Sequence, residues 1–410
     1  YVLGSILVVF GIYSLLLIVT KSYLIGIAII SLVIPLIVVF VVIVVKKLDF
    51  FGDFIPYLVS LTRVYYPVII MLSLFMYGLT LYLDAKSVYD SSEKKIVKFG
   101  LLQPNFSPWD KLLAEDFGKL EEVIDLYREA GNVSDIVVGC ESILRDPVNA
   151  YYEYRRLFGI RAMNVSKYIK KPIILTYPHR EVTLTNTFVK RGSETFGVIQ
   201  EITKYYNSAL FFDYQGKPVA RYDKVHTVPF GEWTPFAEYI PQLRETINLI
   251  VGGEISPGKE FLVVSVEIKP SVVVNLGPII CFEDLYPYIT RRLRMFGADV
   301  LVNMTNDGWA RSVKSQWQHL VGALFRAIET GLPLIRATNT GKTALILPYG
   351  KIISKINDFE KGFMVAEVKL EKIPTFFVIY GEYIMIIVIL IANLFIFFYP
   401  LVKFFVLNWF

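Results

Sequence analysis

Three residues could together carry out nucleophilic chemistry: Glu141 and Cys281, which stand at or near the ends of short apolar runs, and Lys224, which precedes an apolar turn segment. Cys281 closes the run 277–280 and is followed closely by two acidic residues. A cysteine at the end of a strand is more often a small buried hydrophobic residue than a nucleophile. A reactive thiol also needs a partner that makes or stabilises its thiolate, so Cys281 alone does not predict catalysis.

Lys224 and Glu141 are candidates for those partners. An isolated lysine is usually solvated, but Lys224 stands among apolar residues before a Pro-Phe-Gly turn at 229–231. There it could be a fixed cation beside a thiolate or an oxyanion. Glu141 closely follows the apolar run 136–138, where burial would raise its pKa and suit a general base. Glu232 could position the same site or simply be exposed.

Other residue types restrict the kinds of site that are expected. His226 could pair with Cys281, but a lone histidine in such a segment is more often a structural hydrogen-bonding group, and we favour that role. The histidines are widely spaced and no HExxH or CxxC pattern occurs, so we expect no metal and no cofactor. Two cysteines predict no disulfide framework. The net charge of +5 is scattered, so no nucleic-acid partner is expected.

Strands and helices alternate between the candidate residues. Helical patterns cover 111–130, 149–169 and 316–330, whereas short β-rich runs occur at 96–102, 136–138, 173–176, 208–214, 262–267, 272–276, 301–304, 334–337 and 344–347. This alternation predicts an α/β sandwich. Ligand sites in such folds gather at the carboxyl ends of strands, so we expect Glu141, Cys281 and Asn306 to converge.

The apolar residues, 54% of the chain, are concentrated in two blocks outside this domain. Four uncharged or nearly uncharged runs are each close to the length that spans a bilayer: 3–20, 24–45, 64–83 and 376–401. We therefore expect transmembrane helices in 1–90, a catalytic domain in 96–370, a transmembrane helix in 375–401 and a short cytoplasmic tail in 402–410.

Lysines in the short loops predict the orientation of these spans. Lys46 and Lys47 follow the second run, which places that loop in the cytoplasm and the catalytic domain on the extracytoplasmic face. The chain opens with Tyr1 inside an apolar stretch, so we expect further membrane segments upstream. The protein is thus predicted to be a multi-pass protein of the cytoplasmic (inner) membrane.

The ordered Glu–Lys–Cys set resembles the nitrilase (carbon–nitrogen hydrolase) superfamily over about 96–368. The resemblance is carried by the Pro-Phe-Gly turn after Lys224, by Cys281-Phe282-Glu283, and by the stretches 206–209, 306–309, 318–319, 326–329 and 336–341. It implies an αββα sandwich that holds Glu141, Lys224 and Cys281 as a catalytic triad.

Spans on both sides of the domain, with the stretches 226–232 and 326–341, make the chain similar to the membrane branch of the superfamily that acylates lipoproteins. The resemblance implies that Cys281 takes an acyl group from a phospholipid and passes it to the α-amine of a diacylated lipoprotein. Glu141 would be the base and Lys224 the oxyanion partner, with support from Glu232, Glu283 and Trp309. The expected oligomeric state is a monomer.

The chain departs from this branch at three positions. Cys140 replaces the usual proline before the catalytic glutamate, Phe282 replaces a tyrosine, and Ala310 replaces an aromatic residue. These changes affect substrate detail rather than reaction class. Two alternatives remain: a membrane-anchored amidase or hydrolase that uses water as acceptor, and a membrane-bound binding protein that has kept the fold without the activity.

Overall fold

The computed structural model describes residues 54–107, 117–144, 170–191, 194–236, 254–310, 312–353 and 356–381, together with a few single positions beyond them. The chain divides into two compact units, 1–87 and 88–410. Of the predicted membrane segments, the first two lie outside the described residues, as does most of the fourth. The third falls within helix α3 (Phe54–Ser91). Within the described residues, no helix combines the length and apolar character needed to cross a membrane.

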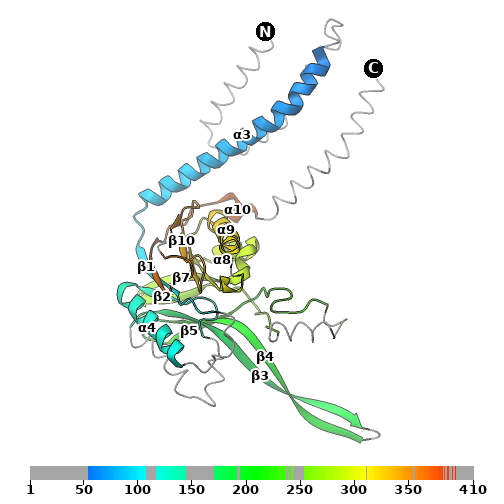
Figure 1. The fold of residues 1–410 in the computed structure, drawn as a ribbon, viewed down its shortest axis with the longest axis vertical. Helices are drawn as coiled ribbons and strands as arrows, with labels where there is room; N and C mark the ends of the chain where they lie inside the picture. Colours follow the sequence, from blue (N-terminus) through cyan, green and yellow to red (C-terminus); the bar gives the residue numbers. More distant parts are fainter. Residues whose placement is uncertain are drawn as a thin grey trace. The chain divides into compact units, whose positions relative to one another are not determined.

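The second unit is built on two six-stranded sheets, drawn in Figure 1. In one sheet the order is β12 (Gly362–Lys369), β1 (Ile96–Gln103), β2 (Ile136–Val138), β3 (Ile173–Arg191), β4 (Glu194–Phe212) and β5 (Pro218–Asp223). The other runs β11 (Ile352–Ile353), β10 (Ala344–Ile346), β9 (Leu334–Thr338), β8 (Val300–Thr305), β7 (Val272–Ile280) and β6 (Val264–Lys269). Strands β1 to β3 and strands β7 to β9 are parallel, which brings their carboxyl ends to common edges.

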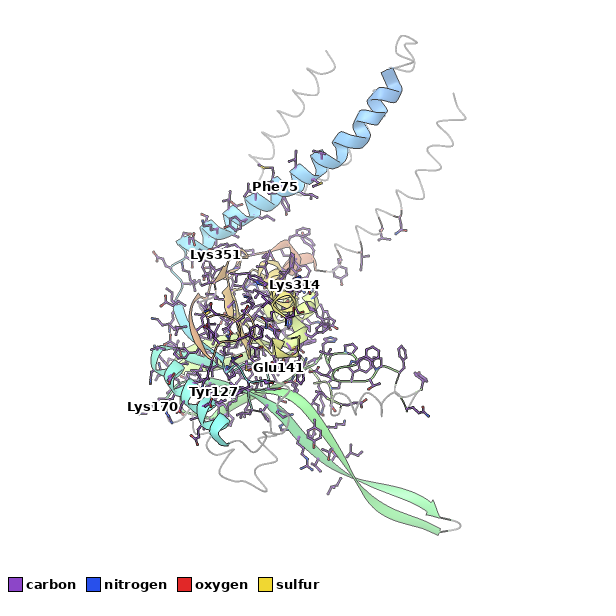
Figure 2. The ribbon with its side chains drawn as sticks, viewed as in Figure 1. Phe75, Tyr127, Glu141, Lys170, Lys314 and Lys351 are labelled. Carbon is purple, nitrogen blue, oxygen red and sulfur yellow. The ribbon has the colours of Figure 1, made fainter. Side chains whose placement is uncertain are left out.

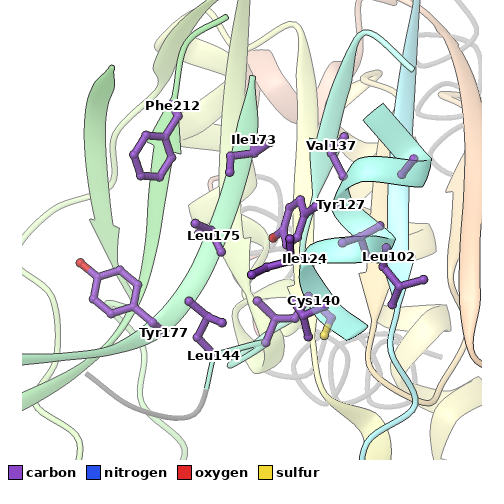
Figure 3. Close-up of a cluster of buried hydrophobic side chains, with 14 residues drawn as sticks. Leu102, Ile124, Tyr127, Val137, Cys140, Leu144, Ile173, Leu175, Tyr177 and Phe212 are labelled. Atoms are coloured by element: carbon purple, nitrogen blue, oxygen red, sulfur yellow. The ribbon is translucent and has the colours of Figure 1, made fainter. Parts of the chain in front are cut away.

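Helices pack on these sheets through buried apolar side chains. On the first sheet, α4 (Phe117–Val133) places Tyr127 and Ala130 against Val137 of β2, within the cluster shown in Figure 3. On the second, α9 (Val313–Thr330) and α8 (Pro287–Met295) share a buried cluster with strands that include β8 and β9. The predicted nitrilase-type α/β sandwich is therefore confirmed. The predicted helix 149–169 lies outside the described residues.

The hairpin of β3 and β4 is much longer than the sequence pattern indicated. Its ladder runs without interruption from the pair Ile173–Phe212 to the pair Arg191–Glu194. Side chains are buried at its base, but Val182 and Leu184 are exposed farther out. Figure 1 shows the pair of strands extending beyond the rest of the sheet. The sequence pattern alone gave no reason to extend the short predicted strands 173–176 and 208–214 into this hairpin.

Candidate active site

Cys281 lies where strand β7 turns into the short helix η2 (Cys281–Leu285). Its backbone φ is +52°, in the left-handed region that residues other than glycine seldom occupy. Local strain of this kind is concentrated at functional sites, where the surrounding structure holds it in place. The side chain is only partly buried. The thiol is therefore presented at the carboxyl edge of the second sheet rather than packed in its core.

Lys224 is completely buried one residue beyond β5, between two carboxylates. Its Nζ lies 2.8 Å from Oε1 of Glu232 and 3.8 Å from Oε1 of Glu141. Burial alone would lower the pKa of Lys224, but the charges of Cys281, Glu141 and Glu232 outweigh burial and raise that pKa. The lysine is thus a buried cation close to the thiol, a position from which it could stabilise negative charge.

Glu141 follows β2 and is also buried. The amide of Asn207, on β4, donates to its Oε1 over 2.7 Å. Burial raises the pKa of Glu141 and the Lys224 charge reduces this effect only in part, so the carboxylate has more affinity for a proton than an ordinary glutamate. Burial and the charge of Glu141 together raise the pKa of Cys281 well above its usual value, against the effect of Lys224. The resting thiol is therefore neutral and has a base beside it.

Glu232 and Glu283 hold the loop that carries Lys224. Glu232 bridges Lys224 and the backbone N–H of Val228, 2.8 Å from its Oε2. Glu283 lies two residues beyond Cys281 and is fully buried. It accepts hydrogen bonds from the Tyr222 hydroxyl and from the backbone N–H groups of 225, 226 and 280. Burial raises the pKa of Glu283 to about 7. One carboxyl thus joins the segment of Lys224 to the segment of the nucleophile.

His226 and Trp309 take different positions from the triad residues. The ring of His226 stacks on Tyr286 with centroids 4.4 Å apart, while its backbone N–H binds Glu283. The ring is therefore packed among aromatic side chains, and the hydrogen bond to Glu283 comes from the backbone rather than from the imidazole. Trp309 lies in η3 (Asp307–Ala310), just beyond β8, and is 52% exposed. Strand β8 is the parallel neighbour of β7, so Trp309 stands near the same edge of the sheet as the nucleophile.

Two residues of the site were given no role from sequence. Asn207 binds Glu141. It lies within the stretch 206–209 that carries the family resemblance, but on an antiparallel strand, where the strand-end rule for parallel strands gives no signal. Thr305, the last residue of β8, is close enough to the Cys281 thiol to lower its pKa in part. The signal that could have found Thr305 is its position at the carboxyl end of a parallel strand next to β7.

A buried ion network begins three residues after the nucleophile. It consists of Asp284, Asp307, His319 and Arg336. The guanidinium of Arg336, from β9, lies 2.7 Å from Asp284 and 3.2 Å from Asp307, and it also donates to Asn303. The His319 ring on α9 contacts the same two aspartates at 2.9 and 2.7 Å. The network joins the ends of β7, β8 and β9 to α9 and fixes the turn that carries Cys281.

Comparison with known proteins identifies the family of the chain. A family model described as carbon-nitrogen hydrolase matches residues 173–376, which include Lys224 and Cys281. The chain belongs to the carbon–nitrogen hydrolase (nitrilase) superfamily. Among curated relatives, it is similar to the apolipoprotein N-acyltransferase of Borreliella burgdorferi, with 28% identity over 79% of this chain and 58% of the relative. It is also similar to apolipoprotein N-acyltransferase 2 of Treponema denticola, with 32% identity over 72% of this chain and 54% of the relative.

The chain thus spans little more than half the length of these relatives. Among solved structures, it is similar to a carbon-nitrogen hydrolase from Helicobacter pylori G27, with a TM-score of 0.45 and 17% identity. That match covers 67% of this chain and 89% of the other.

Proposed function

We propose that this chain is an N-acyltransferase that moves a fatty acyl group from a phospholipid to the N-terminal α-amine of a diacylglyceryl-cysteine lipoprotein, through a thioester on Cys281. The observation that carries the proposal is the buried Lys224, held between Glu141 and Glu232 beside a cysteine on a strained turn. The names of the relatives support the choice of acceptor. No cofactor is needed, because the triad supplies the nucleophile, the base and the cation.

In the first half-reaction Glu141 takes the thiol proton while Sγ of Cys281 bonds to the ester carbonyl carbon. Lys224 stabilises the oxyanion of the tetrahedral intermediate. When the intermediate collapses, the ester C–O bond breaks and Glu141 returns the proton to the departing lysophospholipid. The raised pKa values of Cys281 and Glu141 support this order of events, because the proton stays on the thiol until a substrate draws it away.

In the second half-reaction the lipoprotein amine attacks the thioester carbon. Glu141 accepts the amine proton as the C–N bond forms, and Lys224 again stabilises the oxyanion. The C–S bond then breaks and the thiolate of Cys281 recovers a proton from Glu141. Glu141 therefore ends each half-reaction as a carboxylate, and the second half-reaction restores the thiol of Cys281, which permits repeated turnover.

Both proposed substrates carry acyl chains, so the site requires an apolar approach. Phe230, Trp233 and Phe236 follow Lys224 in the chain and are 56%, 41% and 68% exposed. Exposed aromatic side chains beside a buried charged site suit contact with lipid chains. We further propose that the protein is a monomeric multi-pass protein of the cytoplasmic membrane with this domain on its extracytoplasmic face. The apolar runs and their flanking lysines support that placement.

The test is mass spectrometry of the full chain after incubation with a phospholipid that carries a labelled acyl chain. We expect a hydroxylamine-sensitive acyl adduct on Cys281 that persists until an amine-bearing diacylated lipopeptide is added. Cys281→Ala should remove the adduct, whereas Cys140→Ala, a change of the buried core cysteine, should keep it. Rapid release of free fatty acid without the lipopeptide would overturn the proposal in favour of a hydrolase that uses water.

A further inference from the structure

Helix α9 exposes an apolar stripe on the side that does not face its sheet. Val313, Trp317, Val321, Phe325 and Ile328 recur at the spacing of one helical face, and each is between 40% and 51% exposed. The opposite side of the helix packs on the second sheet through Leu320, Ala323 and Ala327, beside the buried polar residues Gln316 and Arg326. A surface helix normally turns polar residues outward, so this stripe requires a surrounding other than water.

The polar residues of α9 suit the headgroup region of a bilayer. Lys314, labelled in Figure 2, is the one charged side chain of this helix that is largely exposed. Arg326 and Glu329 are paired with each other at 2.9 Å, and no acidic side chain of α9 is largely exposed. The ammonium of Lys342 lies 4.8 Å from the centre of the Trp317 ring. Lys342 is itself paired with Asp358, so the exposed lysine of this face is Lys314. Tryptophan and lysine are both typical of helices that lie at a membrane surface.

The stripe is continuous with helix α10 (Phe376–Tyr380), the start of the fourth predicted membrane run. The hydroxyl of Thr375, which caps α10, donates to the backbone carbonyl of Glu329 in the last turn of α9. From α8, the guanidinium of Arg291 binds backbone carbonyls of α10. Ile379 of α10 is itself 64% exposed. The apolar surface of α9 therefore leads directly into the segment expected to enter the bilayer.

We propose that the exposed stripe of α9 lies on the lipid bilayer, parallel to its surface, and fixes the height of the catalytic domain above the membrane. The inference rests on the proposed membrane-bound function. A second copy of the chain is the competing occupant, but the exposed Lys314 borders the stripe, and the stripe leads into α10. Lysine is depleted from the cores of protein–protein interfaces. Because α9 follows η3 at the edge that carries Cys281, its position on the bilayer would set the distance between the nucleophile and the ester groups of the lipids.

The experiment places an environment-sensitive fluorophore on a cysteine at Val321 in the full chain, reconstituted singly in lipid nanodiscs. The background is Cys140→Ala with Cys281→Ala, so that only the new cysteine reacts. The matched control is Val273→Cys, because Val273 of β7 is equally apolar and 54% exposed. Circular dichroism checks that both labelled proteins are folded. Spin-labelled lipids with the quencher at different depths then report the position of each fluorophore.

We expect the label at 321 to lose most of its fluorescence to a quencher near the headgroups, and less to one near the bilayer centre. An interfacial helix buries its apolar face by about 5–10 Å, so the shallow quencher is the nearer one. The label at 273 should be quenched by aqueous iodide instead. Equal lipid quenching at both positions would overturn the proposal. So would shielding of the label at 321 from iodide without lipid quenching, because protein rather than lipid would then cover the stripe.

The measurement needs no turnover, and its outcome is therefore separate from that of the acyl-adduct experiment. Loss of the adduct with retained lipid quenching would reject the enzymatic proposal alone. The reverse result would reject only the position of α9.

Discussion

Two buried charge clusters lie within a few residues of Cys281, and they differ in how completely their charges are matched. In the nucleophile cluster, one cation, Lys224, faces Glu141, Glu232 and the thiol of Cys281. In the buried ion network, Arg336 and His319 face two aspartates. The second cluster has one cation for each carboxylate, whereas the first has one cation too few. Burial makes this difference important, because an unmatched buried charge is costly.

The protons respond to this difference in opposite ways. In the nucleophile cluster, burial raises the pKa of Glu141 and of Cys281, so the pair retains a proton that can move. In the network, burial would raise the pKa of Asp307, but Arg336 and His319 hold it below its ordinary value. A matched cluster fixes its protons and stabilises the fold. An unmatched cluster keeps a proton available for chemistry, which is the property a catalytic triad needs.

Glu141→Gln should have the largest effect on activity, because it removes both the base and the unmatched charge. We expect acyl transfer to fall roughly 10²- to 10⁴-fold, the usual contribution of a general base. The fold should remain stable, since Lys224 keeps Glu232 as its partner. The charge of Glu141 raises the pKa of Cys281, so the variant thiol should react with iodoacetamide at lower pH than the wild type. An unchanged pH profile of alkylation would contradict the coupling of the two groups.

Arg336→Met should disrupt the buried ion network. Its primary effect should be a loss of stability, whereas that of Glu141→Gln is a loss of activity. Two buried aspartates would lose a cation, and breaking a buried pair in this way costs about 3–5 kcal/mol. Denaturant unfolding of the full chain in detergent would measure the change. The matched control is Arg128→Met, whose ion pair with Asp125 is exposed and should contribute less than about 1 kcal/mol. Equal effects at the two arginines would show that the network does not stabilise the domain.

The stability of the network should depend on pH through His319. Burial and the charge of Arg336 would lower the pKa of His319, but Asp284 and Asp307 outweigh them and raise it to about 9. A raised pKa contributes stability below the unfolded value near 6.5, and this contribution is lost as the pH rises through about 9. The loss should be on the order of 3 kcal/mol for the side chain, which is 16% exposed. His319→Asn should abolish this part of the pH dependence in thermal melts, and a retained dependence would assign it to another group.

The sequence predicted the nucleophile cluster better than the network. Glu141 and Cys281 follow apolar runs at strand ends, a local signal that predicts convergence in an α/β sandwich, whereas Lys224 was assigned to the set by the family resemblance. The network depends on Asp284 meeting Arg336 across three neighbouring strands, and no local pattern reports such a pairing. The long hairpin of β3 and β4 was missed for a related reason. Beyond its buried base, the described side chains at 181–184 are exposed, so the burial alternation that marks a strand is absent there.

The two cysteines give the smallest predicted effect and the sharpest separation between reactive and structural positions. Cys140 precedes Glu141 in the chain but belongs to the apolar cluster on α4, where it is 1% exposed (Figure 3). Burial and the charge of Glu141 raise the pKa of Cys140, so it should resist alkylation. Cys140→Ala should cost about 1 kcal/mol through the lost packing of one sulfur. The acyl adduct should remain on Cys281 in that variant. Loss of the adduct in Cys140→Ala would instead show that Cys140, and not Cys281, is the nucleophile.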